Sequence, residues 1–195
     1  MNILEWLKSD NHNQICIYNP DYDSVKRNLN NYRTNAMNVF GAIIANTGGI
    51  CFENTVRIFG STNDADKRDI YLWNRSYGND NIILIGDDIY GGIYAINIKL
   101  KNLIKGNICY FAPDTLMWED LNVSLKNFIA YLKLEDISKL YPQIDSSQYD
   151  LFKNLNVNYN DVISFYPPQW SKEFKENGYK FNLINVAEYY NNINL

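Results

Sequence analysis

The chain has 195 residues and a formal net charge of −4, with 46% hydrophobic and 15% aromatic residues. A chain of this length can bury a core without a metal or disulfide, and its aromatic content excludes a disordered chain. The acidic balance excludes a surface built to bind nucleic-acid phosphates, and the single histidine, His12, excludes mechanisms that need two imidazoles.

Residues 1–34 are predicted to form a helix, a strand and a second helix. Apolar residues within Ile3–Leu7 fit one face of a short helix, and Gln14–Tyr18 reads as a strand that ends at Asn19-Pro20. A polar helix is expected over Asp21–Tyr32, with an aspartate or serine near its N-cap.

Residues 35–134 are predicted to form the sheet and helix core. Two apolar runs, Val39–Ala45 and Ile50–Phe59, are joined by Asn46-Thr47-Gly48-Gly49, which predicts a hairpin. A helix is expected next, over Asp64–Trp73.

Three short strands follow, over Ile82–Ile85, Ile93–Ile98 and Asn107–Ala112. Consecutive strands with short connections favour an antiparallel meander. The spacing over Ser124–Leu134 predicts an amphipathic helix capped by its serine.

Residues 135–195 are predicted to be mainly helical. Helices are expected over Ser147–Leu155 and Leu183–Tyr190, and one strand over Val162–Phe165. Because no repeat, linker or composition break appears, we expect one domain over 1–195, of α+β class.

The meander predicts that carboxylates gather at one end of the sheet. The turn after the first strand and the exit of the third strand lie at the same end of an antiparallel meander. No lysine or arginine occurs over 82–98 or 106–125, whereas Lys99, Lys101 and Lys105 mark the opposite end. The expected acidic end contains Asp87, Asp88, Asp114, Glu119 and Asp120.

Several interpretations of these carboxylates stay open. They could be turn-forming aspartates, a hydrolase pair, a Ca²⁺ or Mg²⁺ site, or a surface that binds a partner. Trp118 and Trp170 could be core-edge residues or interface anchors. The glycines of Gly86–Gly92 lack the spacing of a dinucleotide site, and the three cysteines form no metal motif, so no cofactor or metal is expected.

The N-terminus predicts a cytoplasmic protein. Glu5 stands where a signal peptide needs a basic residue, and no apolar segment follows it. The longest wholly apolar stretch, near Phe40–Ala45, is far too short to span a bilayer, so no membrane association is expected.

Five segments together resemble an uncharacterised bacterial domain family of unknown function. They are Thr47–Ile50, Arg57–Gly60, Asp87–Gly92, Tyr110–Glu119 (Tyr-Phe-Ala-Pro-Asp-Thr-x-x-Trp-Glu) and Phe165–Trp170. The order of the elements is in turn similar to the SUKH superfamily. That resemblance implies a curved, mostly antiparallel sheet packed with helices and a non-enzymatic role. Many bacterial SUKH proteins are immunity proteins that neutralise a cognate toxin, often a nuclease.

The favoured hypothesis is therefore a protein-binding module whose partner is another protein, such as a basic toxin domain. Its candidate contacts are the five carboxylates of the acidic end with Trp118 and Trp170. One alternative is a hydrolase or metal-dependent enzyme that uses Asp87, Asp88, Asp114 and Glu119. Another is a small-ligand domain with an apolar pocket between sheet and helix.

Overall fold

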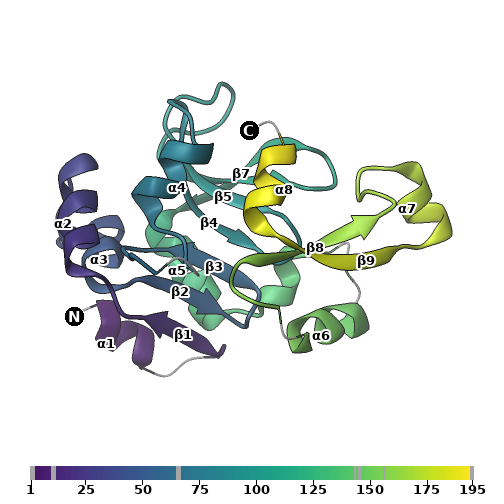
Figure 1. The fold of residues 1–195 in the computed structure, drawn as a ribbon, viewed down its shortest axis with the longest axis horizontal. Coiled ribbons are helices and arrows are strands. Elements are labelled where there is room, and N and C mark those ends of the chain that lie inside the picture. Colours follow the sequence, from purple (N-terminus) through teal and green to yellow (C-terminus); the bar gives the residue numbers. More distant parts are fainter. Residues whose placement is uncertain are drawn as a thin grey trace.

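A seven-stranded antiparallel sheet forms the centre of the protein in the computed structural model (Figure 1). The structure describes residues 3–9, 12–64, 67–142, 144, 146–155 and 157–193. The strands follow one another across the sheet in chain order. They are β1 (Ile15–Tyr18), β2 (Gly49–Phe52), β3 (Val56–Phe59), β4 (Ile82–Asp88), β5 (Ile93–Asn97), β6 (Asn107–Ala112) and β7 (Met117–Ser124).

A separate two-stranded antiparallel sheet belongs to the C-terminal part of the chain. It pairs β8 (Asp161–Tyr166) with β9 (Lys180–Asn185), and it meets the large sheet at the β4–β5 turn, where the N–H of Ile163 donates to the carbonyl of Ile89 (Figure 1). The helix after β9, α8 (Val186–Asn192), contacts both of its strands. The predicted α+β class with a mostly antiparallel sheet is confirmed.

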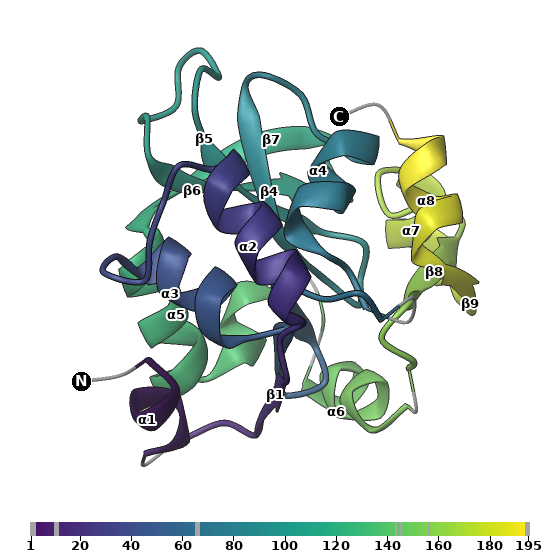
Figure 2. The same cartoon turned by 60° about the vertical axis from the view of Figure 1, so that its left-hand side comes forward.

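Helices surround the large sheet, and three of them form a group near the N-terminus (Figure 2). In this group α1 (Ile3–Lys8) packs on α3 (Val39–Asn46), and α3 packs on α5 (Leu125–Leu134). The other helices are α2 (Tyr22–Asn31), α4 (Ile70–Tyr77), the 3₁₀ helix η1 (Ile137–Leu140), α6 (Ser146–Asn154) and α7 (Lys172–Asn177). No helix of the described residues is long and apolar enough to cross a membrane.

The hairpin predicted across the two apolar runs is wrong, because the first run is helix α3. The side chain of Asn38 caps this helix by accepting the N–H of Gly41 at 2.9 Å. The hairpin instead joins β2 to β3 through Glu53 and Asn54, with φ of 54° and 53°. Two consecutive left-handed residues give the tight turn that matches the twist of paired strands.

Two other predicted helices begin later than expected. Asp69 caps α4 through the N–H groups of Tyr71 and Leu72, so the helix starts at Ile70 rather than Asp64. Within the segment Leu183–Tyr190, the first three residues complete β9, and helix α8 begins only after Asn185 provides its cap.

Strand β7 was not predicted, and it places the acidic residues that follow β6 differently from the prediction. It returns along β6 as one edge of the large sheet and leads directly into α5. Its register shifts opposite Asn107–Cys109, and Asn122 has φ 56°, which marks a bulge in the strand. The meander therefore has a fourth strand. The residues after β6 run along this strand from one end of the sheet to the other.

Candidate functional site

Asp87 and Asp88 are buried inside the protein, not exposed on an acidic surface as expected. They end β4, which is a central strand paired with β3 and β5. Their exposed fractions are 1% and 0%. In this structure neither carboxylate can reach a partner or a substrate in solution, so both leave the set of candidate contacts.

Asp87 is an ion-pair partner for two buried guanidinium groups. Its Oδ1 lies 2.7 Å from Arg57 Nε and 2.9 Å from Arg68 Nη2. The remaining donors of Arg57 bind main-chain oxygens, including those of Tyr159 and Asp161 at 3.0 and 2.6 Å. Since charges removed from water need both a counterion and hydrogen bonds, this cluster is built for structure. It fixes the start of β8 against the large sheet.

Asp88 organises the turn between β4 and β5 and receives tyrosine hydroxyls. Its Oδ1 accepts the N–H groups of Tyr90 and Gly92, each at 2.9 Å. Its Oδ2 accepts the hydroxyls of Tyr110 at 2.9 Å and Tyr141 at 3.2 Å. Burial raises the pKa of Asp88, although these hydrogen bonds oppose the shift. The two adjacent carboxyls thus have different partners. Asp87 forms ion pairs with two arginines, whereas Asp88 accepts hydrogen bonds from neutral donors.

The β6–β7 turn presents apolar side chains to solvent beside acidic ones. Leu116 is 39% exposed and Met117 is 62% exposed. Leu116 has φ 56°, an unfavourable conformation for a bulky residue. Asp114 is half-buried, and Glu119 is exposed and accepts a hydrogen bond from the hydroxyl of Thr115. The turn therefore combines an apolar centre with carboxylates at its margin.

Asp120 lies at the opposite, lysine-bearing connection rather than at the acidic end where it was expected. Its carboxylate accepts the N–H groups of Ile104 and Asn122, each at 2.7 Å, and the amide of Asn107 at 3.0 Å. Slight burial acts to raise the pKa of Asp120, but these hydrogen bonds outweigh it and lower the pKa. The unpredicted course of β7 explains this position, and Asp120 serves to hold the connection before β6.

The two candidate tryptophans differ in exposure. Trp118 is half-buried and packs edge-to-face on Phe111, with 5.4 Å between ring centroids. Trp170 is 53% exposed. Its neighbour Gln169 donates a hydrogen bond to the carbonyl of Tyr90, in the β4–β5 turn. Because that turn and the β6–β7 turn close the same end of an antiparallel sheet, Trp170 belongs to the same end as Met117.

Sequence reasoning missed both buried arginines and the tyrosines around Asp88. Arg57 had a usable signal, because it is the one charged residue within the apolar strand Val-Arg-Ile-Phe. A charge in such a strand is seldom fully buried unless it is paired. Arg68 had no comparable signal, because it follows a polar segment and its approach to Asp87 depends on the tertiary fold.

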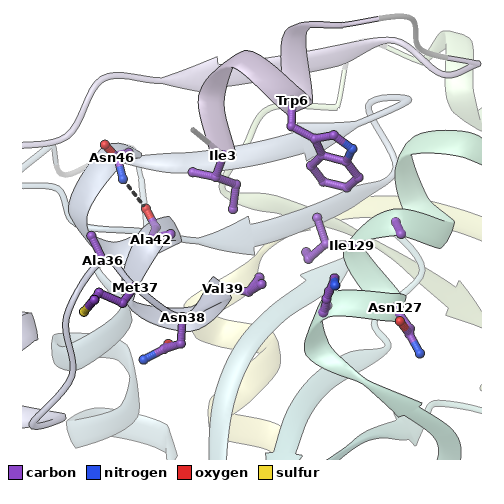
Figure 3. A pocket seen from close by; sticks show the side chains of 12 residues that line it. Ile3, Trp6, Ala36, Met37, Asn38, Val39, Ala42, Asn46, Asn127 and Ile129 are labelled. Atoms are coloured by element: carbon purple, nitrogen blue, oxygen red, sulfur yellow. Dashed lines mark hydrogen bonds between the residues drawn. The ribbon is translucent and has the colours of Figure 1, made fainter. Parts of the chain in front are cut away.

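A large hollow lies between helices α1, α3 and α5, away from the sheet end just described (Figure 3). Its volume is about 540 Å³, within the range of small-molecule sites. The expected apolar pocket lay between sheet and helix, whereas this hollow is lined by three helices and by the segment that leads into α3. It is lined by Ile3, Trp6, Ala36, Met37, Asn38, Val39, Ala42, Asn46, Lys126, Asn127, Ile129 and Ala130.

A smaller polar hollow of about 290 Å³ contains the single histidine. His12, Asp136 and Ser138 all line it, which are the residue types of a catalytic triad. The hydroxyl of Ser138, however, donates to Asp136 Oδ1 at 2.7 Å, so the serine is bound to the carboxylate rather than activated by the imidazole. Within the part of the chain that is described, no group of three or more histidine, cysteine or acidic residues could hold a metal ion.

Comparison with known proteins identifies relatives along most of the chain. The model of a family described as "Protein of unknown function DUF2625" matches residues 1–188. The protein YbfG of Escherichia coli (strain K12), whose name calls it uncharacterized, is 29% identical over 174 residues, which are 86% of this chain and 78% of that protein. An uncharacterized protein of Haemophilus influenzae is 29% identical over 147 residues, 71% of this chain and 64% of that protein.

Proposed function

The chain belongs to the DUF2625 family, and from that premise we propose that it is a cytoplasmic, non-enzymatic module that binds another protein through the β6–β7 turn. The observation that carries this proposal is the exposure of Leu116 and Met117 beside the carboxylates of Asp114 and Glu119. The partner surface is basic and offers an apolar cleft to the two side chains.

The chemistry of the turn supports such an interface. Protein interfaces have an apolar centre within a polar rim, and methionine adapts to the shape of a partner because its side chain is unbranched. No lysine or arginine occurs over 106–125, so the segment that contains β6, the turn and β7 adds no charge that repels a basic partner. Complementary charge speeds association and fixes orientation. Trp170, at the same sheet end, offers an aromatic anchor.

The class of partner follows from the resemblance to the SUKH superfamily. Immunity proteins of that group bind a toxin and block it, and nuclease toxins need basic surfaces for their substrates. We therefore propose a toxin domain with a basic surface as the partner. The enzymatic alternative is less favoured, because Asp87 and Asp88, two of its four carboxylates, are enclosed and bound by structural partners.

A co-expression experiment tests this function. The protein encoded by the gene beside this one is produced alone and together with this chain, and cell growth and co-elution are measured. We expect toxicity alone, and growth and a stable complex together. Met117→Lys should weaken the complex at least tenfold, because it removes apolar contact and adds a repelling charge.

Met37→Lys provides the matched control, since Met37 is 94% exposed and lies on the helical side of the protein. Its complex should keep the affinity of the unmodified protein. A neighbouring product that is harmless and does not bind would contradict the proposed function. Equal affinity of Met117→Lys and Met37→Lys for the neighbouring gene product would contradict the proposed surface.

A further inference from the structure

The hollow between α1, α3 and α5 is lined by apolar side chains that suit the binding of an alkyl chain. Six apolar side chains line it from the three helices (Figure 3). They are Ile3 and Trp6 from α1, Val39 and Ala42 from α3, and Ile129 and Ala130 from α5. The hollow is partly open to solvent. Burying an alkyl chain against such walls stabilises a complex by about 0.8 kcal/mol for each methylene.

One wall of the hollow is fixed in place by a buried lysine. Lys133, only 2% exposed, places its Nζ 4.6 Å above the ring of Trp6. The same ammonium donates hydrogen bonds to the carbonyl of Trp6 and to the hydroxyl of Ser9. Because Trp6 is held by these contacts, the wall exists before a ligand arrives, and little conformational entropy is lost on binding.

The charge at the hollow is positive. Among the residues that line it, Lys126 is the one charged side chain, and it is exposed. Lys126 is the second residue of α5, and the hollow also borders the start of α3 at Asn38 and Val39. Neither helix has an acidic residue in its first turn. Helix N-termini favour anions, so a lysine at this place adds to a positive potential that no neighbouring acid of the lining offsets.

We propose that this hollow binds a free single-chain carboxylate, with its alkyl chain against the apolar walls and its carboxylate at Lys126. The site lies beyond the proposed interface. Lys126 comes two residues after Ser124, the last residue of β7, whereas Met117 begins that strand, so the two regions lie at opposite ends of it.

Titration with sodium laurate below its micelle concentration tests the proposal. Tryptophan fluorescence of the full chain is measured, and Trp6→Phe identifies the part of the signal that comes from the hollow. We expect saturable binding of one laurate per chain with a signal that is lost in Trp6→Phe. Dodecyltrimethylammonium, which has the same chain length and a cationic head, should bind at least fivefold more weakly.

Two variants separate the alkyl chain from the carboxylate. Ala130→Phe places an aromatic ring in the hollow and should weaken laurate binding at least tenfold, and circular dichroism checks that this variant folds. Lys126→Gln changes an exposed residue and should weaken laurate binding about three- to tenfold, whereas the control Lys101→Gln, on the β5–β6 connection, should not. Calorimetry, which does not depend on tryptophan, measures both affinities.

Several results would overturn the site. They are the absence of saturable binding, equal affinity for the cationic amphiphile, and unchanged binding by Ala130→Phe or Lys126→Gln. Binding to phosphatidylglycerol vesicles without binding of monomeric laurate would also overturn it, because the hollow would then contact a membrane surface. None of these results depends on whether the β6–β7 turn binds a protein.

Discussion

The end of β4 and the β6–β7 turn lie at the same end of the sheet and both carry carboxylates, yet they differ in what surrounds them. Asp87 and Asp88 belong to a central strand and are enclosed by arginines and tyrosines. Glu119 belongs to the edge strand β7 and faces solvent. At this end of the sheet, the central strand encloses its acidic residues, whereas the edge strand leaves Glu119 exposed to solvent.

Removal of the charge of Asp87 is the strongest way to test this difference. Asp87→Asn keeps the volume of the side chain but leaves Arg57 and Arg68 without their counterion. Breaking a buried ion pair in this way costs about 3–5 kcal/mol. We expect urea unfolding to show a loss of this size, together with weaker docking of the segment that begins β8. A loss below about 1 kcal/mol would show that the cluster is not structural.

Substitution of Asp88 should change the free energy of unfolding by a smaller amount that depends on pH. Burial raises its pKa, so the folded protein holds the proton of this carboxyl more tightly than the unfolded chain does. The free energy of unfolding therefore falls as the pH rises above the ordinary aspartate pKa of about 3.9 and through the raised native value.

Asp88→Asn removes this titration and costs about 1–3 kcal/mol at low pH, because the hydrogen bonds of Tyr110 and Tyr141 change. The advantage of the unmodified protein over this variant should shrink as the pH rises. Urea unfolding of both proteins between pH 4 and pH 8 measures this difference in stability. A difference that grows with pH would mean that the carboxyl is stabilised in its ionised form.

Glu119→Gln should have the smallest effect on stability. Its side chain is exposed and its one hydrogen bond is long, so the free energy of unfolding should change by less than about 0.5 kcal/mol. Association with a basic partner should become a few times slower at low salt and be unchanged at high salt. An equal effect at both salt concentrations would exclude a steering role.

The sequence predicted those elements whose local signals agree with the fold. β6 has the predicted bounds, and α5 carries the predicted cap at Ser124. An aspartate or serine was expected near the start of α2, and Asp21 caps it. β7 was missed because the alternation of exposed and half-buried residues breaks at Asp120 and Leu121, next to the bulge at Asn122, so the segment has no continuous strand pattern. Val39–Ala45 was misassigned because a short, wholly apolar run suits a buried helix as well as a strand.

The candidate site could be predicted only in part. Proximity of Asp87, Asp88 and Asp114 to one sheet end follows from strand order, and the structure retains it. Burial does not follow from strand order, because it depends on Arg68 and Tyr141, which are far from β4 in the sequence. The position of Asp120 required β7, and the helical hollow required the packing of α1, α3 and α5.

Oxidation of Met37 and Met117, the two exposed methionines among the described residues, tests the central claim most directly in the complex. Met37 and Met117 both oxidise readily in the free protein if exposure controls the reaction with hydrogen peroxide. Mass spectrometry of the complex with the neighbouring gene product should show Met117 protected at least fivefold and Met37 oxidised at its free rate. Protection of Met37 with Met117 still reactive would contradict the claim and assign the partner to the helical side of the protein.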